Sequence, residues 1–153
     1  MSHSKRLSKN ANSVIVFLPI KPIYAKKLIA GEKKYEFRKR GFRLDLTHII
    51  IYASSPLRRI VGVAEVQRVI VDSPTATWER AKQAAGISRK AYREYFQGKS
   101  KAYAIKISKI IPFSNWIDPV SLENGFKVPQ SFSYVDHLFF HRALSVGKAT
   151  HAW

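Results

Sequence analysis

The sequence contains no cysteine, which excludes disulfide bonds and thiolate metal sites. Long apolar runs are also missing, since the longest, VIVFLPI and IIIYA, are far shorter than the roughly 20 residues that span a bilayer. The opening stretch MSHSKRLSKNANS has no continuous apolar segment of the kind that a secretory signal requires. We therefore expect a cytoplasmic protein that does not enter a membrane.

Acidic residues are scarce in this chain. Only 10 Asp and Glu stand against 27 Lys and Arg, which leaves a formal net charge of +17. Such an excess destabilises the compact state through self-repulsion and favours a partner of opposite charge, with nucleic acid as the first candidate. The alternative interpretation is a solvated surface kept soluble by repulsion. A membrane surface is a weaker candidate, because no basic helix with a broad apolar face is apparent.

The chain length fits one domain. With 153 residues and 46% hydrophobic content, the chain can bury a core without disulfides or metals. We predict a flexible basic arm over residues 1–13, a folded domain over residues 14–135 and an extension with a short helix over residues 136–153.

Periodicity and end signals predict the order of the elements. A β-branched run over residues 14–20 predicts a buried strand, and a helix is expected from Pro22 to a C-terminal glycine at Gly31. The segment 33–39 alternates like a strand. Further strands are expected over residues 47–53, 59–71 and 101–113, and helices after N-caps at Ser73 and Ser88. This order predicts an α+β fold, a mixed and mostly antiparallel β-barrel with flanking helices.

The alternation in KKYEFRK also suggests a charged wall. Tyr35 and Phe37 fall on one face of the predicted strand, and Lys34, Glu36 and Arg38 fall on the other. If the aromatic face packs inward, Glu36 and Arg38 are neighbours whose opposite charges hold each other in place.

Four segments in this order resemble the ASCH family of the PUA-like superfamily: KPIYAKKLIAGEKKYEFRKR, IIIYASSPLRRIVGVAEV, GISRKAYREYFQGKSKAYAIKI and VPQSFSYV. The core pattern is Gly31, Lys33, Glu36 and Arg38, and the resemblance covers approximately residues 14–135. It implies a small β-barrel with a cleft between barrel and helices, and a role in RNA binding or RNA-linked regulation. One branch of the family hydrolyses the amide of N4-acetylcytidine, and a ribonuclease activity has been attributed to another.

Lys33 and Glu36 are the candidate catalytic residues. Lys33 matches the lysine that the amidohydrolase branch uses for catalysis, and Lys34 and Arg38 are neighbouring cations that favour loss of its proton. That branch places a threonine three residues after the lysine, whereas this chain has Glu36, whose carboxylate favours the protonated amine. The alternative is that Lys33, Glu36 and Arg38 form a structural ion-pair ladder at the mouth of the barrel.

The predicted nucleic-acid contacts are cations of the basic wall, hydroxyls after an apolar strand, two helical aromatics and one loop amide. They are Lys21, Tyr24, Lys33, Lys34, Arg38, Lys39, Arg40, Arg43, Ser54, Ser55, Arg58, Arg59, Trp78, Tyr95 and Gln130.

Several of these residues have a second interpretation. Trp78 and Tyr95 occur at helical spacing that equally suits a packed core, and the hydroxyls can cap their own turn. We expect no cofactor and no metal, because His137 and His141 stand one helical turn apart without a third ligand in view. The expected partner is RNA or a modified nucleotide, with DNA as a further possibility, and the oligomeric state stays open.

Overall fold

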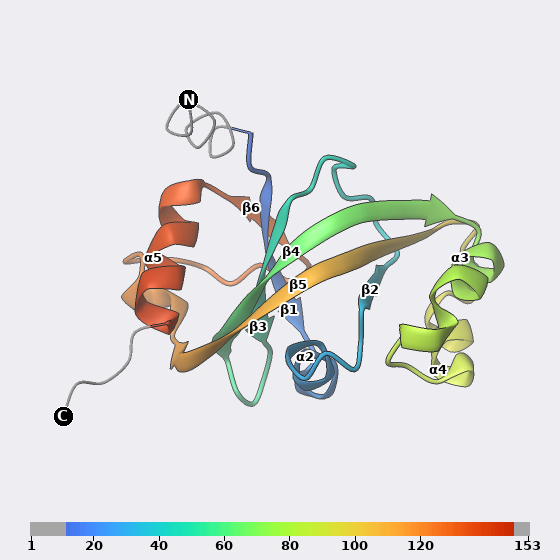
Figure 1. The fold of residues 1–153 in the computed structure, drawn as a ribbon, viewed down its shortest axis with the longest axis horizontal. Helices are drawn as coiled ribbons and strands as arrows, with labels where there is room; N and C mark the ends of the chain where they lie inside the picture. Colours follow the sequence, from blue (N-terminus) through green and yellow to red (C-terminus); the bar gives the residue numbers. More distant parts are fainter. Residues whose placement is uncertain (1–11, 149–153) are drawn as a thin grey trace.

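The computed structural model of the chain describes residues 12–148 (Figure 1). Its centre is a six-stranded sheet with the order β2-β5-β4-β3-β1-β6. The strands are β1 (Ile15–Ile20), β2 (Tyr35–Arg38), β3 (His48–Ala53), β4 (Arg59–Asp72), β5 (Ala102–Ile117) and β6 (Ser133–Val135). Strand β1 is parallel to β3, and the other four strand pairs are antiparallel. The predicted α+β class with a mixed, mostly antiparallel sheet is therefore confirmed.

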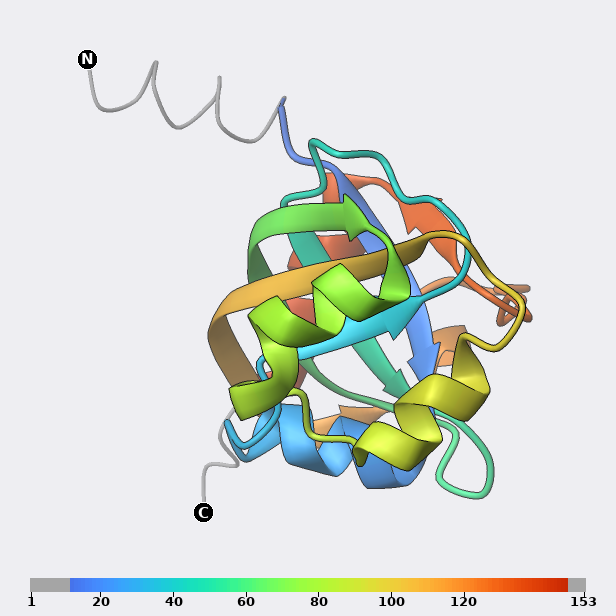
Figure 2. The same ribbon diagram turned by 90° about the vertical axis from the view of Figure 1, so that its right-hand side faces the viewer.

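The two longest strands, β4 and β5, bend along their length and wrap the sheet partly around itself (Figure 2). Between the edge strands β2 and β6, no ladder is present within residues 12–148, so the sheet curls like a barrel but stays open. Within the same residues, every helix is too short or too polar to span a bilayer.

Local end signals in the sequence set the limits of the helices. These are α2 (Pro22–Ile29), α3 (Pro74–Ala81), α4 (Arg89–Tyr95) and α5 (His137–Gly147), with 3-10 turns η1 (Lys82–Ala84) and η2 (Pro119–Ser121). Ser73 Oγ accepts a bond from Ala76 N, and Ser88 Oγ accepts one from Ala91 N, each at 3.1 Å, as N-caps do. Gly31 has φ +78° directly after α2, the left-handed conformation that favours glycine.

Alternation along β1 places helices on both faces of the sheet. Val16 and Leu18 are buried in a first core cluster with Leu28 of α2. Ile15 and Phe17 point the other way into a second cluster that includes Phe139 and Phe140 of α5. A third cluster lies between β2 and the pair α3 and α4 and contains Tyr35, Phe37, Tyr92 and Phe96. This third cluster fixes α4 against the strand that carries the candidate site.

The terminal segments differ from the predicted plan in detail. Helix α5 forms within the predicted extension 136–153 and buries Phe139 and Phe140 against β1, so this part packs on the core of the domain. Strand β5 continues to Ile117, beyond the predicted end at residue 113. Most of the predicted N-terminal arm lies outside the described residues.

Candidate nucleic-acid-binding cleft

A cleft with a volume of ≈ 620 Å³ lies where the end of β1, the start of α2, strand β2 and helix α4 meet. Eight of the residues predicted from sequence line it. They are Lys21, Tyr24, Lys33, Glu36, Arg38, Ser54, Tyr95 and Gln130. These residues come from five separate parts of the chain, and the fold brings them to one cavity.

Lys33 is the buried cation of the cleft. Only 2% of the residue is exposed, and its Nζ donates a 2.7 Å hydrogen bond to the Ala85 carbonyl. The same nitrogen lies 4.8 Å from the ring centre of Phe37 and 5.3 Å from that of Tyr24. The ammonium therefore has one strong acceptor and two aromatic faces in place of bulk water.

Burial lowers the pKa of Lys33 from 10.5 to about 8. The Glu36 carboxylate acts in the opposite direction and raises the pKa, while Lys27 and Arg38 lower it further. The sequence-based expectation was that Lys34 and Arg38 supply the charge that favours deprotonation. Instead, burial is the largest cause and Lys27 replaces Lys34, because Lys34 points to solvent from the next position of the chain.

Glu36 and Arg38 form the predicted ion pair on one side of β2. Glu36 Oε2 accepts from Arg38 Nη2 at 2.9 Å and from Nε at 3.1 Å. Arg38 Nη2 also donates to the Pro19 carbonyl at 2.7 Å, which ties β2 to the end of β1. The second carboxylate oxygen, Oε1, lies 3.9 Å from Lys33 Nζ, too far for a hydrogen bond. The ladder of the three charged residues is thus present, and Oε1 can still accept from a ligand.

Strand β2 is covered on both sides. Tyr35 and Phe37 pack into the third core cluster, as the alternation predicts. The predicted charged wall on the opposite side is enclosed as well, since Glu36 is only 6% exposed between α4 and the end of β1. A carboxylate this buried needs charged partners, and Arg38 and Lys33 supply them.

The loop between η1 and α4 holds Lys33 in position. Gly86 has φ +67°, and a Cβ added there would lie 2.5 Å from Lys33 Cβ and Cγ. The Gly86 carbonyl accepts from Lys27 Nζ at 3.2 Å, and Lys34 N donates to the Ala84 carbonyl at 2.8 Å. Close approach of this loop to the Lys33 stem therefore requires glycine.

The predicted aromatic residues separate into two groups. The rings of Tyr24 and Tyr95 line the cleft and are half-buried, and Lys39 Nζ lies 4.4 Å from the Tyr95 ring centre. Trp78 does not line the cleft, because its ring packs 4.8 Å from that of Tyr92 beside the third core cluster. Burial also raises the pKa of the Tyr95 hydroxyl.

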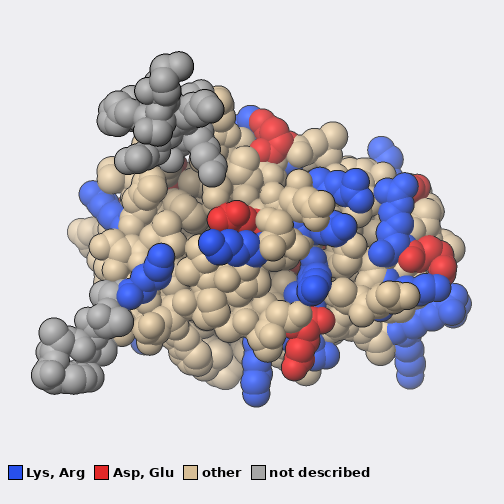
Figure 3. All heavy atoms as spheres, viewed as in Figure 1, with Lys and Arg blue, Asp and Glu red and all other residues tan. Residues whose placement is uncertain are grey.

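The remaining predicted contacts lie on the surface outside the cleft lining. They are Lys34, Lys39, Arg40, Arg43, Ser55, Arg58 and Arg59, and all are exposed. Arg43 is paired with Asp45 at 2.8 Å. On the face shown in Figure 3, cationic side chains are densest toward the side that carries α3 and α4 and sparse near α5. The charge excess is therefore uneven on this face.

Sequence reasoning missed part of the cleft lining. The missed residues are Pro19, Ile20, Phe37, Ile87, Ala91, Tyr92 and Glu94. Most belong to α4 or its preceding loop, which reaches the cleft only through long-range packing on β2. The helical spacing of the aromatics on α4 was the available signal, since it gives that helix a buried side facing the strand.

The comparisons with known proteins agree with this architecture. An ASCH domain-containing ribonuclease from Zymomonas mobilis is 31% identical over 121 residues, which cover 74% of this chain and 79% of that protein. The crystal structure of ASCH from Zymomonas mobilis superposes with a TM-score of 0.79 and 26% identity, over 86% of this chain and 94% of that chain.

A more distant structure shares the fold alone. The N-terminal domain of Staphylothermus marinus McrB gives a TM-score of 0.59 with 13% identity, over 87% of this chain and 94% of that chain. The ASCH domain family model matches residues 18–111 of this chain, from β1 into β5. The chain belongs to the ASCH domain family.

Proposed function

We propose that this chain binds single-stranded RNA, with one base or modified nucleotide held in the cleft beside Lys33. The observation that carries the proposal is the combination inside one cavity of a buried amine, a carboxylate oxygen that accepts no hydrogen bond from residues 12–148, and half-buried aromatic rings. Single-stranded RNA is recognised through unstacked bases that lie on such rings and are hydrogen-bonded at their edges.

The rings and Glu36 suit a base. Tyr24 and Tyr95 offer ring surface within the cleft, and each base stack contributes on the order of 1–3 kcal/mol. Glu36 Oε1 is able to accept from an exocyclic amine, as carboxylates do when they read cytosine. Arg38 supports this role, because its bonds to the other oxygen fix the direction of the carboxylate.

The surface around the cleft suits phosphates. Lys21 is exposed at the rim of the cleft, and the exposed Lys34 and Lys39 directly precede and follow β2 in the chain. Contacts from such cations are independent of base sequence and release counterions, so binding is expected to weaken steeply with salt. Among polyanions, RNA is favoured because the Zymomonas mobilis relative is named a ribonuclease.

RNA hydrolysis is the second candidate function, and the lowered pKa of Lys33 favours it. With a pKa of about 8, roughly a tenth of the Lys33 amines are neutral at pH 7. A neutral amine in the cleft is able to take a proton from a hydroxyl that attacks phosphorus, while the ammonium form stabilises the developing negative charge. In the same scheme Glu36 tunes Lys33, because its carboxylate raises that pKa.

Binding is tested by fluorescence anisotropy with labelled single-stranded RNA over a series of salt concentrations. We expect measurable affinity at low salt that falls as salt rises, and weaker competition by duplex DNA. Tyr24→Ala should weaken binding about tenfold through loss of one stack. Trp116→Ala is the matched control, because that ring is 56% exposed and lies outside the cleft. Salt-independent binding, or equal losses in the two variants, would refute the proposal.

Hydrolysis is tested separately with Lys33→Met. The second candidate predicts that this variant loses RNA cleavage but keeps most of its affinity, since the exposed cations remain. RNA, the same sequence as DNA, and N4-acetylcytidine are the three substrates to compare. Cleavage that persists in Lys33→Met assigns the activity to another group or to a contaminant.

A further inference from the structure

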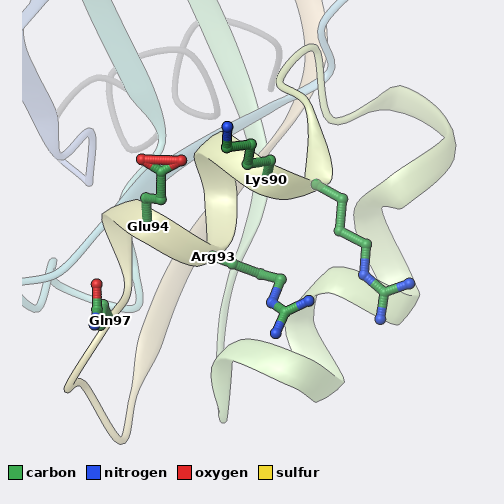
Figure 4. A pocket seen from close by; sticks show the side chains of 5 residues that line it. Lys90, Arg93, Glu94 and Gln97 are labelled. Atoms are coloured by element: carbon green, nitrogen blue, oxygen red, sulfur yellow. The ribbon is translucent and has the colours of Figure 1, made fainter.

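A second hollow lies on the outer side of α4. It has a volume of ≈ 610 Å³ and is lined by Arg89, Lys90, Arg93, Glu94 and Gln97. Figure 4 shows Arg93 extending from one side of the helix and Lys90 and Glu94 from the other. Except for Glu94, none of these residues lines the cleft beside Lys33.

The helical period explains why these side chains point outward. Tyr92 and Phe96 are buried in the third core cluster and fix one side of α4 against β2. Arg89 and Arg93 are one helical turn apart, so they follow one another along a flank of α4 next to that buried side, and Gln97 follows the end of the helix. The arginines thus form a short row held by a packed helix.

Arg89 and Arg93 form no ion pair with an acid in the part of the chain that the structure describes. Glu79 of α3, whose pKa is lowered in part by Arg89, already accepts a 2.8 Å hydrogen bond from Lys82 Nζ. Residues 79–101 contain seven Lys and Arg against two Glu. An anion bound here therefore meets an excess of positive charge, with Glu94 as the acid of the lining.

The hollow and the cleft share helix α4. Glu94 lines both cavities, and Ala91 and Tyr95 of the same helix line the cleft. A strand that leaves the cleft across α4 consequently enters the hollow on the other side. Among the described residues, no aromatic ring lines the hollow. Guanidinium groups bind phosphate in a bidentate manner, so the ligand expected there is the RNA backbone and not a base.

We propose that the row formed by Arg89 and Arg93 binds phosphates of an RNA strand that continues from the cleft over α4. This inference rests on the proposed RNA binding and adds a second subsite and a path for the strand. Glu94 repels phosphate and so directs the backbone toward the arginine flank of the helix. Affinity should therefore depend on RNA length.

The test compares Arg89→Gln/Arg93→Gln with wild type, using a labelled trinucleotide and a labelled dodecanucleotide of RNA. The trinucleotide is short enough to occupy the cleft alone. We expect the double variant to bind the dodecanucleotide about tenfold more weakly, with a salt slope smaller by about 1.4 for two lost phosphate contacts. Its affinity for the trinucleotide should stay at the wild-type value.

The matched control is Lys127→Gln/Lys148→Gln, which removes two exposed cations from the loop before β6 and the end of α5. Equal losses in both double variants, or equal losses for both RNA lengths, would overturn the α4 subsite. In that case the cleft proposal would still hold, provided that wild type binds RNA and that Tyr24→Ala weakens this binding. If wild type binds neither RNA at low salt, both proposals fail.

Discussion

The stability of this protein is predicted to depend on ionisation of the buried Lys33 amine. The folded state lowers the pKa of Lys33 from 10.5 to about 8. Between these two values the unfolded chain binds more protons than the folded one, so stability rises with pH across this window. Below about pH 8 the amine is protonated in both states, and the full cost of burying the charge is present.

The expected size follows from the two pKa values. From pH 7 to pH 10, the Lys33 contribution to the free energy of unfolding increases by about 2–3 kcal/mol. Other groups titrate in this range, so the quantity to compare is the difference between wild type and Lys33→Met. Lys33→Met removes the buried amine. Between pH 7 and pH 10, the free energy of unfolding of wild type should therefore rise by that amount relative to the variant.

Urea titrations of wild type, Lys33→Met and Lys34→Met at both pH values measure this difference. Lys34→Met is the matched control, because it removes an exposed cation from the neighbouring position. Its free energy of unfolding should follow that of wild type between the two pH values. If wild type and Lys33→Met change in parallel, the Lys33 amine is not held in a poorly solvated site and the reasoning fails.

Three further substitutions test the packing around the site by thermal or urea unfolding. Gly86→Ala should destabilise the fold by about 1–2 kcal/mol through its left-handed backbone alone. The added methyl also displaces the Lys33 stem, so the RNA cleavage predicted by the second candidate function should be lost with it. Thr77→Val should stabilise by about 1 kcal/mol, because the buried Thr77 hydroxyl has no hydrogen-bond partner within residues 12–148; a clear loss of stability would contradict this. Gly147→Ala should cost about 1–3 kcal/mol, since the added methyl meets the Phe113 ring, whereas unchanged stability would mean that α5 shifts freely.

Features encoded by neighbouring residues were predictable from the sequence. Pro22 is the first residue of α2, where its fixed φ suits the helix. Ser73 and Ser88 are the N-caps of α3 and α4, because each hydroxyl accepts a backbone N–H of the first turn. The pairing of Glu36 with Arg38 was equally accessible, since alternate residues of a strand share a face.

Features that depend on distant contacts were not predictable in the same way. The burial of Lys33 depends on the Ala85 carbonyl, 52 residues further along the chain, and on the glycine that follows it. No local pattern shows that this loop folds over the lysine. The expectation that neighbouring charge would govern Lys33 consequently underestimated burial as the cause of the lowered pKa.

The candidate site shows the same division. Charge and alternation indicated the wall around β2, but the contribution of α4 to the cleft required packing of Tyr92 and Phe96 on Phe37. Trp78 and Tyr95 were indistinguishable by spacing. They differ in the structure because Trp78 lies against the Tyr92 ring, whereas Tyr95 reaches the cavity.

Photo-crosslinking of a thiouridine-containing RNA strand, followed by mass spectrometry of the linked peptides, tests the central claim most directly. Binding in the cleft predicts crosslinks to the residues that line it, with Tyr24 and Tyr95 foremost, and these crosslinks should disappear when unlabelled RNA is added in excess. Links confined to α5 or to the exposed Trp116 region, with the cleft peptides unmodified, would contradict it.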